Sequence, residues 1–379
     1  MKKTLQRIDY TASTKIQVLE PPSYYTFMLD AGYTSAVKKK EEVVIGDIIA
    51  TCRNTHLYSS CNGIVESVSE KAIKITPHEE STKEQISPLS FKTMERSAQI
   101  EYLEANGIDS LWRNTKNVQV CIINALPTDA VAVQYMPFLF AEEKETLEHG
   151  IETLRSLYPS ARIRCAVPKN ANISMQSVEV VEYAKTYPYT LTPFVKQELE
   201  GQDALGVLTL SLIDLWRIGS IARSGKPLTE TILVVNNAVV RCPVGYPLTS
   251  LLERLSISVD SVAGAVSNGV MNGEPLCTLE GGVLPHFYSL HTFKKEEIPP
   301  VTDDPCVSCG FCTSVCPVGI RVHLLNQYAE RTMFEACQEE HLEACIECGM
   351  CDYVCITKRP IMQYIRNAKQ HTKKMLPMG

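Results

Sequence analysis

Short apolar runs separated by turn residues fill the chain from about residue 15 to residue 77. In residues 43–50, Gly46-Asp47 is expected to form the turn between two apolar strands. Asn62-Gly63 is a strong turn signal, and an alternating strand follows it. The pattern therefore predicts a small all-β sandwich at the start of the chain.

Between about residues 95 and 230 the pattern changes to strands alternating with helices. Residues 118–125 form a continuous apolar run typical of a buried strand, 141–157 have the apolar spacing of a helix, and 161–167 predict a second strand. In residues 232–240, Asn236-Asn237 is expected to turn one strand into the next, and a helix is predicted at 247–255. The chain should thus continue as an α/β unit and then a compact α+β module, with a linker at 296–304.

Length and composition set limits on this picture. A chain of 379 residues predicts two to four domains. Hydrophobic residues at 45% and charged residues at 21% are typical of a soluble globular protein. The net charge of -6 makes nucleic acid an unexpected partner. Residues 1–13 contain no apolar signal segment, and no run approaches about 18 uninterrupted apolar residues, so only peripheral membrane contact is expected.

The fifteen cysteines supply the first chemical signal, because nine of them lie between residues 306 and 355. A disulfide framework is typical of short secreted chains, whereas this chain is long. Eight of the nine follow the spacing C-x2-C-x2-C-x3-C twice, the first copy ending in Cys316-Pro317. Their numbers are Cys306, Cys309, Cys312 and Cys316, then Cys345, Cys348, Cys351 and Cys355.

This spacing predicts two [4Fe-4S] clusters with crossed ligation, since the fourth cysteine of each motif ligates the other cluster. One cluster is assigned to Cys306, Cys309, Cys312 and Cys355, and the other to Cys345, Cys348, Cys351 and Cys316. The alternative is structural zinc, which usually binds two well-separated C-x2-C pairs and fits four cysteines within eleven residues poorly. Cys337 and the six cysteines outside the tail have no ligand spacing and are expected to be core thiols.

Other motif searches are negative. The stretch from Gly219 to Pro227 superficially resembles a phosphate loop but has the wrong spacing, and we expect a simple turn there. No G-x-G-x-x-G, nucleophile elbow or zinc-protease motif occurs, which argues against hydrolase and kinase activity. After Cys355 the chain carries cations and no acids. A helix over 360–371 is predicted, either with a solvated cationic face or docking an acidic partner or lipid head groups.

The doubled motif and its surroundings resemble the C subunit of the Rnf electron-transport complex. The residues that carry this resemblance are 344–349, 353–355, 363–364 and 368–369, with 225–230, 244–247 and 251–253 upstream. The resemblance implies a multidomain α+β fold with four parts. These are a barrel-sandwich β domain (1–90), a Rossmann-like α/β domain (91–227), an SLBB-like β-grasp module (228–295) and an α-helical, ferredoxin-like two-cluster domain (296–379).

Residues 107–116 depart from that family. Members that oxidise NADH have a glycine-rich loop here for flavin and dinucleotide phosphates, whereas this chain has Leu111, Trp112 and Arg113, and keeps only Gly107 as a glycine. With residues 123–129, this stretch is similar to the A subunit of sodium-pumping NADH:quinone reductase, which lacks that NADH site. We therefore expect neither FMN nor NADH to bind tightly. Ile356 also replaces the proline that usually follows the last cysteine.

The resemblance implies an electron relay, with no catalytic residues of its own, at the cytoplasmic face of the inner membrane. Its partners would be the membrane flavoprotein subunits of an Rnf-like ion-translocating complex and a soluble donor, with reduced ferredoxin or flavodoxin favoured over NADH. One alternative is a soluble flavin-dependent reductase resembling cobalamin reductase. Another is a structural adaptor whose upper domains only scaffold neighbouring subunits.

Overall fold

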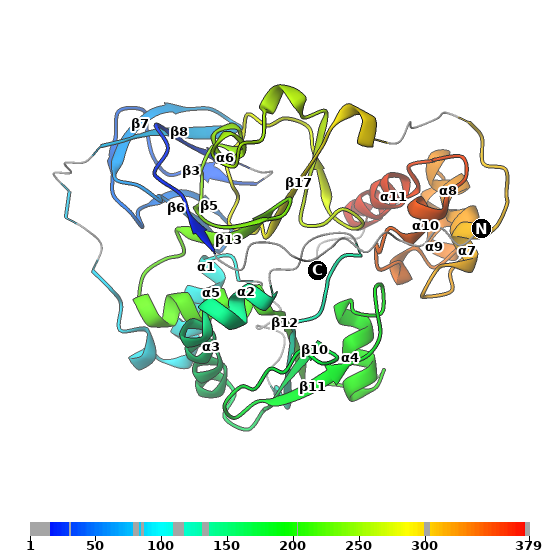
Figure 1. The fold of residues 1–379 in the computed structure, drawn as a ribbon, viewed down its shortest axis with the longest axis horizontal. Helices are drawn as coiled ribbons and strands as arrows, with labels where there is room; N and C mark the ends of the chain where they lie inside the picture. Colours follow the sequence, from blue (N-terminus) through cyan, green and yellow to red (C-terminus); the bar gives the residue numbers. More distant parts are fainter. Residues whose placement is uncertain are drawn as a thin grey trace.

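The computed structural model of the chain describes residues 16–29, 32–78, 83–84, 87–108, 117–130, 136–202, 204–298 and 304–375. The sequence predictions for residues 1–13 and for Leu111, Trp112 and Arg113 lie outside these residues. In the described part, four β-sheets are followed by a cysteine-rich helical tail. Figure 1 shows the tail at one end of the molecule.

The first two sheets form an N-terminal β unit, as the alternating pattern predicts. One sheet contains β2 (Tyr25–Met28), β8 (Ala72–Pro77), β7 (Gly63–Val68) and β4 (Glu42–Val43); the other contains β3 (Thr34–Ser35), β5 (Ile48–Cys52) and β6 (Thr55–Tyr58). A turn at Gly46, whose φ is 93°, separates β4 from β5. At this turn the chain passes from one sheet to the other. Apolar residues of both sheets pack together in one core.

A four-stranded parallel sheet follows, in the order β11-β10-β9-β12. Its strands are β9 (Val120–Asn124), β10 (Arg162–Pro168), β11 (Glu179–Tyr183) and β12 (Val207–Ser211). Its helices are η1 (Phe91–Thr93), α1 (Arg96–Ala105), α2 (Met136–Glu142), α3 (Lys144–Leu157), α4 (Thr192–Glu200) and α5 (Leu212–Ser224). Helices α3 and α5 pack on one face of the sheet, and Val195 of α4 packs on the other. Apolar residues therefore line both faces, as a parallel sheet requires.

Two predictions in this region are wrong in detail. The helix predicted over 141–157 is divided at Glu143, whose buried carboxylate accepts hydrogen bonds from Trp216 and Thr146. The turn expected from Gly219 is helical as far as Ser224, and only Gly225 ends the helix with a left-handed conformation. Gly219 packs directly against α3, because a Cβ there would lie 1.8 Å from the carbonyl oxygen of Thr146.

The third region is a six-stranded mixed sheet with short helices. Its order is β1 (Gln17–Val18), β14 (Ala238–Pro243), β13 (Glu230–Val235), β17 (Ser289–Phe293), β15 (Gly264–Ser267) and β16 (Glu274–Leu276). The short helices are α6 (Leu248–Arg254), η3 (Val259–Ser261) and η4 (Lys295–Glu297). The predicted turn at Asn236-Asn237 joins β13 to β14 in an antiparallel hairpin, with Asn236 at φ 48°. Ile232 and Val234 of β13 also pack into the core of the parallel-sheet unit.

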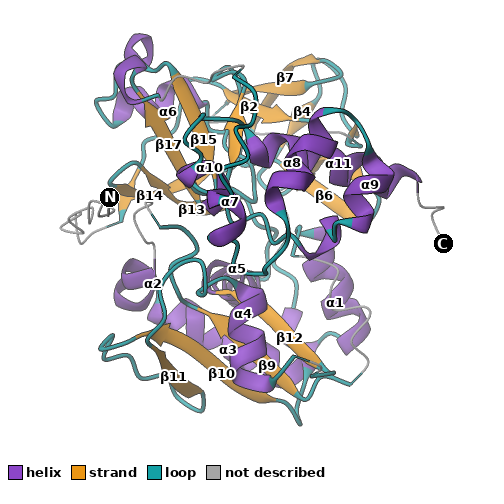
Figure 2. Cartoon of the chain, turned by 90° about the vertical axis from the view of Figure 1, so that its right-hand side faces the viewer, coloured by secondary structure: helices purple, strands orange, loops and turns teal. Residues whose placement is uncertain are grey.

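The cysteine-rich tail is entirely helical in its regular structure. Its elements are α7 (Phe311–Ser314), α8 (Val322–Glu330), α9 (Phe334–Glu339), η5 (Leu342–Ala344), α10 (Met350–Val354) and α11 (Ile361–Met375). In Figure 2 these helices lie above the parallel sheet. The helix predicted over 360–371 is confirmed as α11, whose Ile361, Ile365 and Ala368 are buried in the tail's own core.

The described chain is thus a mixed α/β structure with several sheets and a helical tail. Within the described residues, no helix has both the length and the apolar character needed to cross a membrane.

Candidate metal centre

Each half of the tail contributes cysteines to both of two small cavities. The first cavity is lined by Cys306, Cys309, Cys312 and Cys355, which we call the first set. Three of these come from the first motif and one from the end of the second. The structure therefore brings together the same four cysteines that the spacing assigns to one cluster.

The second cavity is lined by Cys345, Cys348, Cys351 and Cys316, which we call the second set. Here the first motif supplies the single cysteine and the second motif supplies three. Short helices α7 and α10, one within each motif, pack against each other, which lets the last cysteine of each motif reach the opposite cavity.

The backbone of the two motifs is bent in the same way at matching positions. Ser308 and Glu347 have φ of 52° and 56°, and Gly310 and Gly349 have φ of 77° and 71°. A left-handed residue reverses the local direction of the chain, so each loop curls around its cavity instead of extending. Gly310 and Gly349 are also the N-cap residues of α7 and α10, and the next cysteine of each motif lies in that helix.

Burial governs the protonation of four of these thiols. Removal from water raises the pKa of Cys312, Cys345, Cys348 and Cys351, because it disfavours the charged thiolate. Burial also acts to raise the pKa of Cys355, but hydrogen bonds from the Thr357 hydroxyl and from the backbone N–H groups of Arg359 and Thr357 outweigh it and lower the pKa. Metal binding to the buried thiols would displace their protons.

The donors in each cavity fit an iron-sulfur cluster. Four thiols surround each cavity, and four thiolates are the ligand set of a [4Fe-4S] cluster. Within the described part of the chain, no three His, Cys, Asp or Glu side chains are grouped so as to hold a single metal ion.

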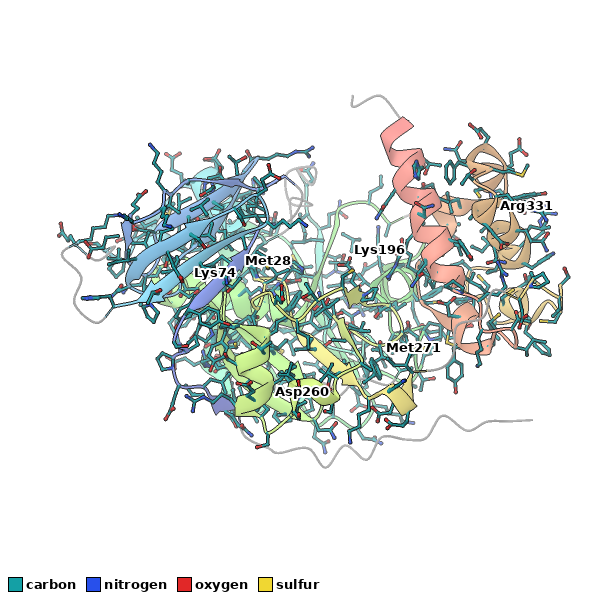
Figure 3. All side chains as sticks on the ribbon, turned by 90° about the horizontal axis from the view of Figure 1, so that it is seen from above. Met28, Lys74, Lys196, Asp260, Met271 and Arg331 are labelled. Atoms are coloured by element: carbon teal, nitrogen blue, oxygen red, sulfur yellow. The ribbon has the colours of Figure 1, made fainter. Side chains whose placement is uncertain are left out.

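The second motif is also attached to the rest of the molecule. The Tyr187 hydroxyl donates a hydrogen bond to the carbonyl oxygen of Cys348. Arg366 of α11 donates to the carbonyl oxygens of Asn272 and Gly273 at 2.6 and 2.8 Å. Figure 3 shows Met271, in the same loop, at the boundary with the tail, whereas Arg331 lies on the tail's far side. The second set is therefore the one nearer to the parallel and six-stranded sheets.

Sequence reasoning missed the residues that surround the first set. Arg359 is only 4% exposed and lines the first cavity, although the sequence favoured a solvated cationic end for this segment. His323, Asn326 and Thr357 line the same cavity. A position-by-position comparison of the sequences of the two motifs and the segments that follow them would have identified these cavity-lining residues.

The remaining cysteines mostly match expectation. Cys337 is fully buried in α9. Cys61, Cys121, Cys165 and Cys242 are buried, and Cys52 is partly buried. Cys277 is exposed, so the expectation of a core thiol is wrong there; it follows β16, which is the edge strand of the six-stranded sheet among the described residues.

Comparison with known proteins finds several C subunits of ion-translocating oxidoreductase complexes. The C subunit of the ion-translocating oxidoreductase complex of Buchnera aphidicola is 21% identical over 94% of this chain and 85% of its own length. The C subunit of the proton-translocating ferredoxin:NAD(+) oxidoreductase complex of Clostridium ljungdahlii is 19% identical over 96% of this chain and 91% of its own length. The Na(+)-translocating counterpart of Acetobacterium woodii is 26% identical over 44% of this chain and 39% of its own length.

No family model matches the chain. Among solved structures, an NAD+-reducing [NiFe]-hydrogenase in the air-oxidized state has a TM-score of 0.44 and 12% identity, covering 68% of this chain and 54% of that chain. That likeness is too low to support a conclusion. The resemblance indicated by the cysteine motifs is nevertheless confirmed by sequence: over nearly its whole length, the chain is similar to the C subunit of ion-translocating, Rnf-type oxidoreductase complexes.

Proposed function

We propose that this chain is an electron-transfer subunit of an Rnf-like ion-translocating membrane redox complex. The observation that carries the proposal is the gathering of eight cysteines into two crossed sets, each lining its own cavity. Cys306, Cys309, Cys312 and Cys355 would hold one [4Fe-4S] cluster, and Cys345, Cys348, Cys351 and Cys316 would hold the other. Such clusters, when bound, accept and release single electrons.

The surroundings of the two sets support a relay. Cys309 is exposed, and the neighbouring apolar residues Val307 and Phe311 are 57% and 51% exposed. The second set lies on the opposite side, against Tyr187 and the loop that contains Met271. The two sets would thus connect the surface of the tail to the interior of the molecule.

The remaining parts of the chain are assigned by the same proposal. Residues 1–90 would be a barrel-sandwich domain, 91–227 a Rossmann-like domain, 228–295 an SLBB-like β-grasp module and 296–379 the two-cluster domain. The mixed sheets of the described residues and the relatives' coverage of the whole chain support this division. The partners would be membrane flavoprotein subunits and a soluble carrier, with peripheral attachment at the cytoplasmic face of the inner membrane.

The donor in this proposal is a reduced ferredoxin or flavodoxin. Relatives are named as parts of ferredoxin:NAD(+) oxidoreductase complexes, which supports a ferredoxin on one side of the reaction. In the sequence, Leu111, Trp112 and Arg113 occupy positions at which a phosphate-binding loop needs glycines, which favours ferredoxin or flavodoxin over NADH.

Rapid mixing of the reconstituted protein with each donor tests the proposal. Reduced ferredoxin should bleach the cluster absorbance quickly, and Cys316→Ala, which removes one thiol of the second set, should diminish that response. NADH alone should leave the absorbance unchanged. Bound flavin together with fast bleaching by NADH would instead favour a flavin-dependent reductase, the alternative that the sequence leaves open.

A further inference from the structure

The two cavities are built from the same positions of an internal repeat. Each cysteine of the second motif follows its counterpart in the first by 39 residues. The same offset relates most of the other residues that line the cavities, so that Val307 corresponds to Ile346 and Ile361 to Val322. The backbone repeats as well, since Gly319 and Lys358 have φ of 72° and 52°. Differences between matched positions are therefore differences in the environment of equivalent sites.

Four matched positions differ in the same direction. They are polar around the first cavity and apolar around the second. The pairs are Thr357 and Val318, Arg359 and Ile320, His323 and Met362, and Asn326 and Ile365, with the first-cavity residue given first. The first set is therefore surrounded by hydrogen-bonding groups and a cation, and the second set by aliphatic side chains and a thioether.

Arg359 is the largest of these differences. It is buried, its Nη1 donates to the carbonyl oxygen of Asp304 at 2.6 Å, and its Nη2 lies 2.6 Å from a carboxylate oxygen of Glu330. Its Nε is also buried but has no hydrogen-bond partner among the described residues. A buried N–H donor without a partner is costly, and a cluster in the adjoining cavity would offer its sulfur atoms as acceptors.

Thr357 provides a second donor to the same set. Its hydroxyl oxygen lies 3.4 Å from the sulfur of Cys355. Val318, its counterpart, has a similar shape but no hydroxyl, so it offers no such contact to Cys316. Arg366 and Lys369 lie near the second motif and are paired with Glu347, as Arg359 is paired with Glu330. The difference is position, because Arg359 lines the first cavity, whereas neither Arg366 nor Lys369 lines the second.

Charge and hydrogen bonding around a cluster set its reduction potential. Reduction adds one negative charge, and that charge is stabilised by a nearby cation and by donors to sulfur. Aliphatic surroundings give no such stabilisation. The first cavity is also bordered by the exposed Cys309, which admits water, and water stabilises the more negative state as well.

We infer that the first set holds the cluster of higher reduction potential and the second set the cluster of lower potential. This inference rests on the proposed function, because it requires both clusters. One electron would pass from the group held by the second set, which is oxidised, to the group held by the first set, which is reduced; no bond is made or broken and no proton is needed. A single electron in the protein would therefore reside at the exposed end of the tail.

Redox titration of the full-length, reconstituted protein tests the inference, with dithionite as reductant and electron paramagnetic resonance as readout. Arg359→Ile copies the matched residue of the second cavity. It should lower the higher of the two midpoint potentials, so that the reduced-to-oxidised ratio at the wild-type midpoint falls about tenfold, or about 59 mV for one electron. The lower midpoint should not move. A shift of the lower midpoint, or no shift in protein that keeps both clusters, would overturn the inference.

Two nearly isosteric variants guard against a folding defect in the first. Thr357→Val removes only the hydroxyl and should lower the higher midpoint. The reciprocal Val318→Thr places a hydroxyl at the second set and should raise the lower midpoint. If Arg359→Ile loses iron, Thr357→Val and Val318→Thr test the inference instead. A shift of the lower midpoint in Thr357→Val, or of the higher midpoint in Val318→Thr, would overturn it. Wild-type protein that does not assemble two clusters would refute the proposed function itself, which the iron content reveals before any titration.

Discussion

Substitution of Gly349 tests how the second motif is attached to the rest of the molecule, and Gly310 offers a matched control. Both glycines have left-handed backbone conformations, at equivalent positions of the two motifs. A Cβ at Gly349 would lie 2.0 Å from the carbonyl oxygen of Met271, whereas a Cβ at Gly310 would have nothing within 4 Å. The two alanine variants therefore share the conformational cost and differ in one contact.

The magnitudes follow from these two terms. An alanine in a left-handed conformation costs about 1–2 kcal/mol, and this applies to both variants. At residue 349 the backbone of Met271 must also move, and such overpacking typically costs about 1–3 kcal/mol. The difference between the variants should thus be about 1–3 kcal/mol, or roughly 5- to 150-fold in the equilibrium for separating the motif from the loop.

Amide hydrogen exchange measures this directly, without the assumption that a multidomain chain unfolds in one step. The loop at 268–273 is the reporter, because Arg366 donates to the carbonyl oxygens of Asn272 and Gly273 and the N–H of Met271 donates to Asp129 at 2.7 Å. Gly349→Ala should accelerate exchange in this loop, and Gly310→Ala should leave it near the wild-type rate. Equal effects of the two variants, or none at Gly349→Ala, would refute the described attachment.

Two further predictions concern the cofactors. Cys316→Ala should damage the cluster held mainly by Cys345, Cys348 and Cys351. That cluster is identified in the titration as the one whose midpoint potential shifts in Val318→Thr. Damage confined to the other cluster would mean that ligation is not crossed. The reconstituted chain should bind neither FMN nor NADH tightly, because side chains replace the glycines that let a backbone approach phosphate; fluorescence titration showing micromolar FMN affinity would contradict this.

The cysteine sets could be predicted from sequence because their information is local. The spacing within each motif determines which three thiols face one cavity. Because the chain contains two copies of the motif, the fourth cysteine of each copy can be assigned to the cavity of the other. The hairpin at Asn236-Asn237 could be predicted for the same reason, since asparagine readily adopts the left-handed conformation that the turn requires.

Other features depended on tertiary contacts that no local pattern contains. Glu143 interrupts an amphipathic stretch because Trp216 and Arg241, distant in sequence, bind its carboxylate. Gly219 belongs to a helix because α3 packs against it, and the capping box of Ser211 and Asp214 was the overlooked local signal for that helix. Arg359 looked like one more surface cation, and only its place beside the first cavity separates it from Lys358, which is exposed.

Iron and acid-labile sulfide content, measured on anaerobically purified and reconstituted full-length protein, tests the central claim most directly. Two [4Fe-4S] clusters require about eight iron and eight sulfide per chain, and the account predicts that value for the wild-type protein. Zinc as the main metal, or iron without matching sulfide, would contradict the assignment of both cysteine sets and the electron-transfer function that depends on it.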